Sequence, residues 1–282
     1  MSIDLYELTT DLKVRLAKAV HRPGRVIALT GAGISAESGI PTFRGPGGFW
    51  TIGSQVYRSE EISTFEFFAI HPEQSWAWFL WRRNTWGDAQ PNAAHRALVR
   101  LEQALGERFV VITQNIDGLH LAAGHNPERV YEGHGNLQMM RCSAPCGLDV
   151  YPIPPGIGPT GRDEPLGEED RDLLVCPKCG AMTRPHVLWF DETYNEEHYR
   201  IYSARIAAQQ ASLLLVIGTS GSTRLPNDVF AMAGLNGATL VDINPEPNPF
   251  SLMAERMDHG LAIKAPATVV VPPIVDFIEE VL

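Results

Sequence analysis

A single glycine-rich stretch, GAGISAESGIPTFRG from Gly31 to Gly45, limits the possible folds of this chain more than any other feature. It follows the run RVIALT, which has the length and the apolar, β-branched composition of a buried strand. Gly31 and Gly33 carry no Cβ, so the backbone can turn sharply there and approach a ligand closely. We expect a short helix over 34–38, whose first N–H groups would point at a phosphate. The spacing fits the dinucleotide-binding pattern, although a simple glycine turn between a strand and a helix fits it too.

The second half of this stretch differs from the glycine turn of an ordinary dehydrogenase. Gly39 and Pro41 end the predicted helix almost at once, whereas a plain dinucleotide dehydrogenase continues its helix for several turns. Phe43 and Arg44 then offer an aromatic face and a permanent cation beside the expected pyrophosphate. These groups indicate chemistry on the dinucleotide rather than simple binding of it.

At this point the sequence resembles the sirtuin family, the NAD-dependent protein-lysine deacylases. The signature loop of that family starts Gly-Ala-Gly-x-Ser and continues to Ile-Pro-x-Phe-Arg, and this sequence matches it closely. The resemblance extends from about Val26 to Leu282, with the motifs in family order. It is closest to the bacterial, class III-like branch.

The order of the predicted elements indicates an α/β fold. Apolar runs such as ERFVVIT, ASLLLVIGTS and GATLVDINPEP alternate with helical patterns. This alternation predicts a doubly wound, Rossmann-like parallel sheet with a small zinc-binding domain inserted. We expect residues 1–136 and 191–282 to form the NAD-binding domain and residues 137–190 the zinc module. Helices are predicted over 2–20, 60–70, 72–86, 92–105, 195–209 and 272–282.

The chain has four cysteines, which form two close pairs. These are Cys142 with Cys146 and Cys176 with Cys179. In a reducing compartment such pairs bind zinc rather than form disulfides. Four thiolates complete a tetrahedral shell, so the predicted zinc site is structural rather than catalytic. The alternative is two unrelated pairs of buried cysteines.

The charge balance limits the kinds of partner. The formal net charge is −10 and no basic stripe is present, so we do not expect a dedicated nucleic-acid-binding protein. The N-terminal segment carries charges throughout and lacks the apolar centre of a signal peptide. No run approaches the ~18 apolar residues that a membrane span requires. We therefore expect a cytoplasmic protein that does not enter the membrane.

The segment TQNIDGLH, from Thr113 to His120, is predicted at the carboxyl end of a strand. Ligands of open parallel sheets bind at such ends. Polar side chains are costly to bury without a purpose, and Gln114, Asn115 and Asp117 could hydrogen-bond a carboxamide and ribose hydroxyls. A solvated loop is the alternative. In the sirtuin resemblance this segment is the wall of the nicotinamide pocket.

His134 lies between two glycines in the motif YEGHGN, so that another group can approach it closely. An unperturbed histidine has a pKa near ~6.5, which suits a general base at neutral pH. From the local context alone, a structural histidine is the more common interpretation. The matching His-Gly of the sirtuins supplies the catalytic base.

The resemblance implies that NAD is a co-substrate and that acyl-lysine side chains of proteins are the substrates. The acyl oxygen displaces nicotinamide, and the products are free lysine, nicotinamide and O-acyl-ADP-ribose. The residues expected to bind NAD are Gly31, Ala32, Gly33, Glu37, Thr42, Phe43, Arg44, Gln114, Asn115, Asp117, Gly218, Thr219, Ser220, Asn244 and Ala267. Leu188 and Phe190 are expected to pair with the substrate peptide by strand addition.

Three positions depart from the family pattern. The sirtuins that remove succinyl and malonyl groups carry Tyr-x-x-Arg, and the matching positions here are Phe79 and Arg82. We expect both residues at the acyl channel, without the phenol hydroxyl. The segment after Ser220 is one residue longer than usual and contains Arg224. Asp191 replaces the glycine that usually follows the phenylalanine of the substrate strand.

Three further segments have weaker signals. Residues 45–59 are irregular and suit a lid over a ligand, or an ordinary surface loop. The tryptophans of the helix over 72–86 are interpreted as core, with an acyl-pocket wall as the alternative. The insert over 152–172 is rich in proline, glycine and acidic residues, and is predicted to be a solvated loop without its own core.

Two other functions are compatible with the sequence. One is an NAD- or ADP-ribose-binding sensor. The other is an NAD glycohydrolase or ADP-ribosyltransferase that does not deacylate. Formation of O-acyl-ADP-ribose separates a deacylase from both.

Overall fold

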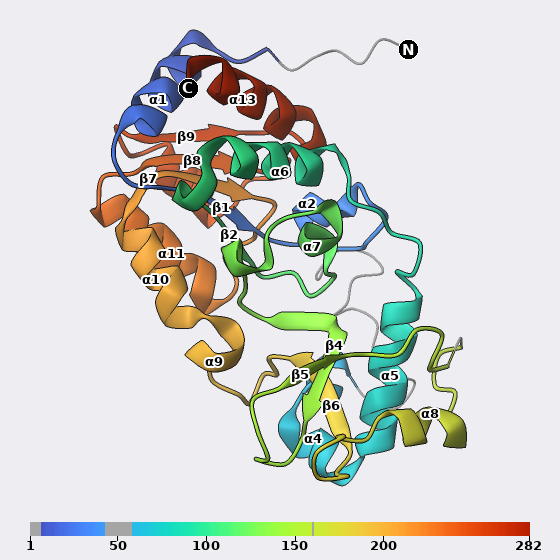
Figure 1. The fold of residues 1–282 in the computed structure, drawn as a ribbon. Coiled ribbons are helices and arrows are strands. Elements are labelled where there is room, and N and C mark those ends of the chain that lie inside the picture. The colour runs from blue at the N-terminus through green and yellow to red at the C-terminus, as the bar shows by residue number, and fades with distance from the viewer. Residues whose placement is uncertain (1–6, 43–57, 160) are drawn as a thin grey trace, which may run out of the picture.

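The computed structural model describes residues 7–42, 58–159 and 161–282, which form a larger and a smaller lobe (Figure 1). The larger lobe holds a six-stranded sheet between two layers of helices, and the smaller lobe holds a three-stranded sheet. Phe43, Arg44 and nearly all of the predicted lid over 45–59 lie outside the described residues.

The large sheet is parallel throughout, which confirms the predicted fold class. Its strands are β1 (Arg25–Thr30), β2 (Phe109–Thr113), β3 (Val130–Glu132), β7 (Ala211–Ile217), β8 (Thr239–Ile243) and β9 (Gly260–Ile263). They lie in the order β3-β2-β1-β7-β8-β9. The connections run in opposite directions on the two sides of β1. The boundary between β1 and β7 is therefore the topological switch point, where ligands of doubly wound sheets bind.

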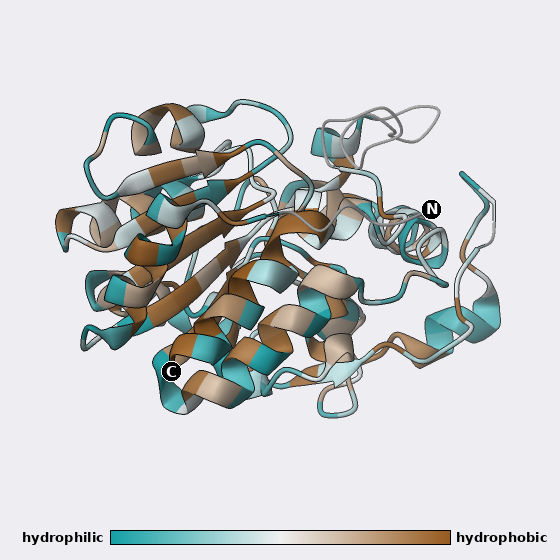
Figure 2. Cartoon of the chain, turned by 90° about the horizontal axis from the view of Figure 1, so that it is seen from above, coloured by the Kyte–Doolittle hydropathy of each residue, from teal (hydrophilic) through white to brown (hydrophobic). Residues whose placement is uncertain are grey.

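Two helix layers bury the two faces of this sheet. The first layer is α1 (Thr10–His21), α6 (Ala93–Leu105) and α13 (Ala267–Val281), and the second includes α10 (Ile201–Gln209) and α11 (Arg224–Leu235). Val26 and Ala28 pack with the first layer, whereas Ile27 and Leu29 pack with the second. Both faces of β1 are thus dry, which explains its continuous apolar run. Figure 2 shows the apolar strands enclosed by the helices.

The smaller lobe is organised around one apolar cluster. Its strands β4 (Gly135–Cys142), β5 (Val150–Pro152) and β6 (Thr183–Val187) pair antiparallel, with β4 in the centre. Helices α3 (Ser59–Ile62), α4 (Phe65–Ile70) and α5 (Pro72–Asn84) contribute to the same cluster. Trp76 and Trp78 are buried in it, which confirms their interpretation as core, whereas Trp81 and Trp86 pack in the cluster and also line a pocket. The packing of this lobe therefore also uses residues before 137.

The insert between the cysteine pairs was wrongly predicted to be a solvated loop. Ile153, Ile157 and Leu166 are buried in the cluster of the smaller lobe. The end of the insert forms α8 (Glu168–Leu173). These apolar residues are spaced singly along the segment, and each one reaches the core. Because proline, glycine and acidic residues surround them, the composition of the segment gives no sign of their burial.

Several predicted helix limits were also wrong. Helix α1 begins at Thr10, because Thr9 is extended and its Oγ1 accepts a hydrogen bond from the Leu12 N–H at 3.3 Å. The predicted helix over 60–70 is divided into α3 and α4, because Thr64 caps α4. The helix over 195–209 is divided into α9 (Glu196–Tyr199) and α10 by Arg200, which has a φ of 52°.

The C-terminal helix begins earlier than predicted. Helix α13 starts at Ala267 and contains Pro272 and Pro273, which were expected to start it. Proline fits the helical φ, but inside a helix it removes an N–H donor and its ring crowds the carbonyl four residues earlier, so packing in the first layer must offset this cost. Strand β9 was not predicted. The remaining short elements are α2 (Gly33–Ala36), α7 (Leu119–Ala123), α12 (Pro249–Ala254) and the 3₁₀ turns Gly106–Arg108 and Pro127–Arg129.

Among the described residues, no helix has both the length and the apolar character that crossing a lipid bilayer requires.

Candidate active site

The loops that follow β1 and β7 touch backbone to backbone at the switch point. The N–H of Gly33 donates to the carbonyl of Gly218 at 2.8 Å. A Cβ on Gly33 would lie 2.6 Å from the Cα of Gly218, and Gly218 has a φ of 63°. Both residues must therefore be glycine for the loops to meet. The glycine motif serves this loop contact as well as the approach of a ligand.

The loop after β2 lies against the same glycine turn. The amide nitrogen of Asn115 donates to the carbonyl of Gly31 at 3.1 Å and to the hydroxyl of Ser35 at 3.2 Å. Asp117 accepts from the Ser35 hydroxyl at 2.7 Å and from the Leu119 N–H at 2.9 Å. Burial raises the pKa of Asp117, and these two hydrogen bonds partly oppose the rise. The amide oxygen of Asn115 is buried and has no hydrogen-bond partner among the described residues.

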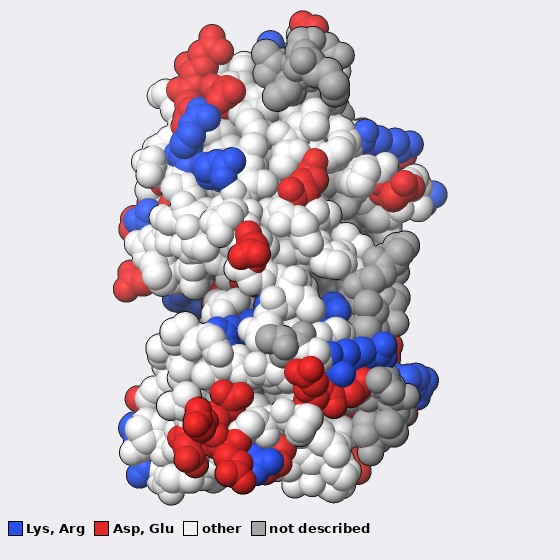
Figure 3. Space-filling view, turned by 90° about the vertical axis from the view of Figure 1, so that its right-hand side faces the viewer, with Lys and Arg blue, Asp and Glu red and all other residues white. Residues whose placement is uncertain are grey.

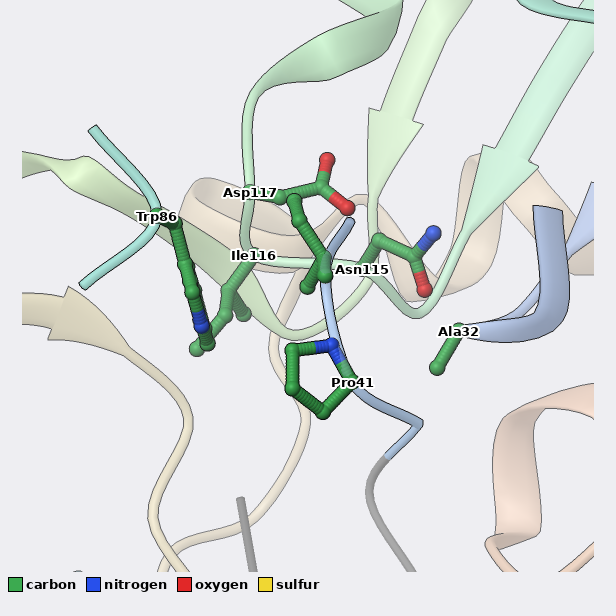
Figure 4. Close-up of a pocket in the computed structure, with 7 residues that line it drawn as sticks. Ala32, Pro41, Trp86, Asn115, Ile116 and Asp117 are labelled. Atoms are coloured by element: carbon green, nitrogen blue, oxygen red, sulfur yellow. The ribbon is translucent and has the colours of Figure 1, made fainter. Parts of the chain in front are cut away.

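These two loops line a small pocket (Figure 4). Its wall consists of Ala32, Ile40, Pro41, Trp86, Asn115, Ile116 and Asp117. Figure 4 shows Ala32 and Pro41 of the glycine-rich segment facing the three residues of the loop after β2. Ala32, Asn115 and Asp117 were predicted to bind NAD and are brought together here. Ile40, Pro41 and Ile116 were not predicted, since apolar residues beside turns give no specific signal.

A second pocket, of about 410 Å³, adjoins the first one. Pro41 and Trp86 line both pockets, and the others lining the second are Gly39, Trp81, Arg82, Thr85 and Arg162. Burial lowers the pKa of Arg82 to about 10, so its side chain remains charged at neutral pH. Phe79 does not line either pocket, because its ring is fully buried and stacks on Trp189 at 6.0 Å.

His134 lies just before β4, at the start of the smaller lobe, and both of its ring nitrogens form hydrogen bonds. Nδ1 lies 3.0 Å from the backbone carbonyl oxygen of Gln114, and Nε2 lies 2.9 Å from the hydroxyl of Tyr194. A carbonyl only accepts, so Nδ1 carries the proton and Nε2 presents a lone pair. Burial lowers the pKa of His134 to about 4, and the bond to Gln114 partly opposes this. The imidazole is therefore neutral at pH 7, the form that a general base needs.

The side chain of Gln114 connects the loop after β2 with the loop after β7. Its amide nitrogen donates to the hydroxyl of Thr219 at 2.7 Å, and its amide oxygen accepts from Thr223 at 3.0 Å. Because the backbone carbonyl of the same residue accepts from His134, Gln114 couples the base to both loops.

The other predicted NAD-binding residues lie at several places along the sheet edge. Glu37 follows α2 and accepts from the Thr268 N–H at 3.1 Å, at the start of α13. Ala267 is the first residue of that helix. Asn244 follows β8 and donates to Asp242 at 3.0 Å. Ser220 is exposed, and Thr42 is partly buried at the end of a described segment.

Sequence reasoning missed two residues near the base. Tyr194 follows the predicted substrate segment, and no flanking pattern singles it out. Glu132 accepts from the side chain of Asn136 at 2.8 Å. Burial raises the pKa of Glu132 to about 7, with a smaller contribution from the nearby charge of Asp117.

The four cysteine sulfurs form one compact group. All four lie within 4.8 Å of one another, with Cys142 and Cys179 at 3.5 Å and Cys146 and Cys176 at 3.6 Å. The backbone N–H groups of Cys179 and Lys178 lower the pKa of Cys176 to about 7. Four soft donors at this spacing fit one tetrahedral zinc ion.

The predicted substrate segment follows β6, an edge strand of the small sheet. The Leu188 N–H donates to the carbonyl of His134 at 2.9 Å, so this segment runs beside the base. The Phe190 side chain is 55% exposed. Asp191 accepts from the N–H groups of Phe65 and Glu66 at 2.7 and 3.0 Å, which caps α4. This cap gives a structural role to the aspartate that replaces the usual glycine.

Comparisons with known proteins agree with this geometry. The model of the Sir2 family matches residues 31–224. An NAD-dependent protein deacylase of Leptospira interrogans is 38% identical over 237 residues, which cover 84% of this chain and 87% of the relative.

Two solved structures are also similar. A Sir2 homolog–NAD complex has a TM-score of 0.76 and 31% identity, and the match covers 99% of both chains. Sir2Tm bound to a propionylated peptide has a TM-score of 0.67 and 25% identity, and the match covers 92% of this chain and 94% of the other. The family match, together with the pockets at the switch point and the cysteine cluster, shows that this chain belongs to the Sir2 family, the sirtuins.

Proposed function

We propose that this protein is an NAD-dependent protein-lysine deacylase that releases nicotinamide and transfers the acyl group to ADP-ribose. The observation that carries this proposal is the neutral imidazole of His134, held at the carboxyl edge of the sheet beside the loops that meet at the switch point. The relative from Leptospira interrogans is named a deacylase of this kind, which supports the assignment.

The lining of the small pocket offers hydrogen-bond acceptors that suit a nicotinamide carboxamide. The orphaned amide oxygen of Asn115 can accept from the carboxamide N–H₂ group, and Asp117 adds a second acceptor in the same wall. The glycines at the switch point carry no side chains, so the pyrophosphate can approach the backbone closely there. We extend the NAD-binding role to the other predicted positions, with Phe43 and Arg44 among them.

NAD supplies a ribose carbon from which nicotinamide leaves when the acyl oxygen attacks. The residues of this chain must then deprotonate a ribose hydroxyl so that its oxygen can attack the acyl carbon. His134 takes up this proton at Nε2, and the carbonyl of Gln114 stabilises the resulting imidazolium through Nδ1–H. His134 thus acts after nicotinamide has left.

The acylated peptide is proposed to bind along the segment from Leu188 to Phe190, by strand addition next to β6. The solved complex of Sir2Tm with a propionylated peptide supports this kind of substrate. The second pocket is the proposed acyl site, with Arg82 in its wall. Phe79 supports that wall from the core rather than touching the acyl group.

The cysteine cluster is proposed to hold structural zinc within residues 137–190, and residues 1–136 and 191–282 to form the NAD-binding domain. Acidic and basic side chains are mixed on the face in Figure 3, which supports peptide rather than dedicated nucleic-acid partners. The four cysteines form no disulfide, which suits a reducing compartment, so we propose that the protein acts in the cytoplasm.

The test uses the purified protein, NAD and a peptide with one acetyl-lysine. We expect nicotinamide, deacetylated peptide and O-acetyl-ADP-ribose in equal amounts. Nicotinamide release without any peptide would identify a glycohydrolase. Tight NAD or ADP-ribose binding with none of the three products would identify a sensor.

A further inference from the structure

The nitrogen of His134 that would act as the base already accepts a hydrogen bond in this structure. Because Nδ1–H donates to Gln114, only Nε2 can accept a proton. The Tyr194 hydroxyl lies 2.9 Å from Nε2 and must be the donor in that hydrogen bond. A sugar hydroxyl that needs to lose its proton to Nε2 therefore meets the phenol group of Tyr194 first.

The phenol oxygen is held in place by the start of α11. The backbone N–H of Leu225 hydrogen-bonds to it, and the Thr223 side chain lies close by. Leu225 is the second residue of α11, where backbone N–H groups have no partner within the helix. Thr223 gives its one hydroxyl proton to the amide oxygen of Gln114 at 3.0 Å, so the second acceptor site of the phenol oxygen stays open. Displacing Tyr194 would break this set of contacts.

We propose that Tyr194 relays the proton between the ribose hydroxyl and His134. The inference rests on the proposed deacylase function. The O–H bond of the ribose hydroxyl breaks and its proton moves to the phenol oxygen, while the phenol proton moves to Nε2. The ribose oxygen keeps the electron pair and bonds to the acyl carbon. Tyr194 ends as it began, and His134 carries the added proton until it loses it to solvent.

This relay needs no movement of the contacts seen here. The phenol oxygen accepts a proton as it gives one up, and the N–H of Leu225 stabilises any negative charge that develops on it meanwhile. Burial raises the pKa of Tyr194 above its usual value, so the phenol remains protonated across the neutral range. The competing explanation is that Tyr194 only covers the base and must leave before the reaction.

The test compares Tyr194→Phe, His134→Ala and the double variant under single-turnover conditions. Two steps are followed: exchange of labelled nicotinamide into NAD in the presence of acetyl peptide, and formation of O-acetyl-ADP-ribose. We expect Tyr194→Phe to slow the second step about 10²-fold or more and to change exchange little, because the relay acts after nicotinamide leaves. The double variant should be no slower than His134→Ala, since both residues serve one proton transfer.

Tyr199→Phe is the matched control, because that buried hydroxyl bonds to Arg141 at 2.9 Å, outside the site. A wild-type or faster rate of product formation in Tyr194→Phe would show that the phenol only covers the base. Equal losses in both steps would show that it only supports the site. Wild-type activity of His134→Ala would instead overturn the proposed function itself.

A second measurement keeps the hydroxyl in place. Incorporation of a fluorinated tyrosine at position 194 lowers the pH at which the phenol ionises. A relay needs the protonated phenol, so the alkaline fall of the product-forming rate should move to lower pH. A hydroxyl that only covers or braces the imidazole would leave that limb of the pH profile unchanged.

Discussion

Arg82 is a buried cation in the wall of the proposed acyl pocket, with 3% of its surface exposed. A charged guanidinium there favours an acyl carboxylate, but Phe79 lies in the core and offers no hydroxyl to assist it. One hydrogen bond to a charged group is worth roughly 1.5–3 kcal/mol, so its loss costs about tenfold to hundredfold in succinyl recognition. We therefore expect kcat/KM for an acetyl peptide to be at least comparable to that for the matched succinyl peptide.

Arg82→Met should lower kcat/KM for the succinyl peptide and leave that for the acetyl peptide within a few-fold. Arg83→Met is the control, since Arg83 donates to Gln138 at 3.1 Å and does not line the pocket. A strong succinyl preference that disappears in Arg82→Met would show that the arginine alone suffices.

At the scale of elements, the loops after β1 and β7 meet backbone to backbone, with no room for a side chain between them. Gly33→Ala places a Cβ 2.6 Å from Gly218, so the loops must separate. We expect a loss of about 1–3 kcal/mol in the free energy of unfolding and weaker NAD binding. Gly167→Ala is the control, because the nearest atom to its added Cβ lies 3.6 Å away. Urea unfolding and calorimetric NAD titration measure both effects, and unchanged values for Gly33→Ala would contradict the contact.

The sequence was informative wherever one local pattern determines one element. Asn92 caps α6 as predicted, and the apolar runs form the central strands, because capping and strand burial depend on few neighbours. The division of the helix over 195–209 at Arg200 and the buried Ile157 depend on distant packing partners, which local patterns do not encode. Tyr194 could not be found for the same reason, since only the fold brings it to the base.

At the scale of the whole molecule, the smaller lobe depends on its cysteine cluster. We expect metal analysis to find one zinc ion per chain and a strong chelator to unfold this lobe, because structural zinc contributes folding free energy. The buried tryptophans in the apolar cluster of the smaller lobe provide a fluorescence signal for its unfolding. A folded protein with four reactive thiols and no zinc would refute this prediction.

Buried histidines should make the stability of the larger lobe depend on pH. His95, His120 and His125 lie in a row, with ring centroids 5.0 and 5.4 Å apart. Burial lowers all three pKa values, that of His95 to about 3. The unfolded chain therefore binds more protons below pH ~6.5, and stability present above that pH is lost as the pH falls.

Buried carboxyl groups act in the opposite direction, since the pKa of Glu132 is raised to about 7 and that of Asp242 to about 6. The test therefore compares variants rather than the total slope. Between about pH 6 and pH 4, His95→Phe should reduce the loss of unfolding free energy by up to ~1.4 kcal/mol per pH unit. Urea unfolding over this range measures the slopes, and parallel slopes would contradict the prediction.

The most direct test of the account is acyl transfer by His134→Ala. With NAD and an acetyl-lysine peptide, wild-type protein should form O-acetyl-ADP-ribose. The variant should lose this activity by about 10²–10⁴-fold and still bind NAD, because His134 acts as a base and not as part of the NAD pocket. His21→Ala, at an exposed position of α1, should behave as wild type. Near wild-type formation of O-acetyl-ADP-ribose by His134→Ala would contradict the account.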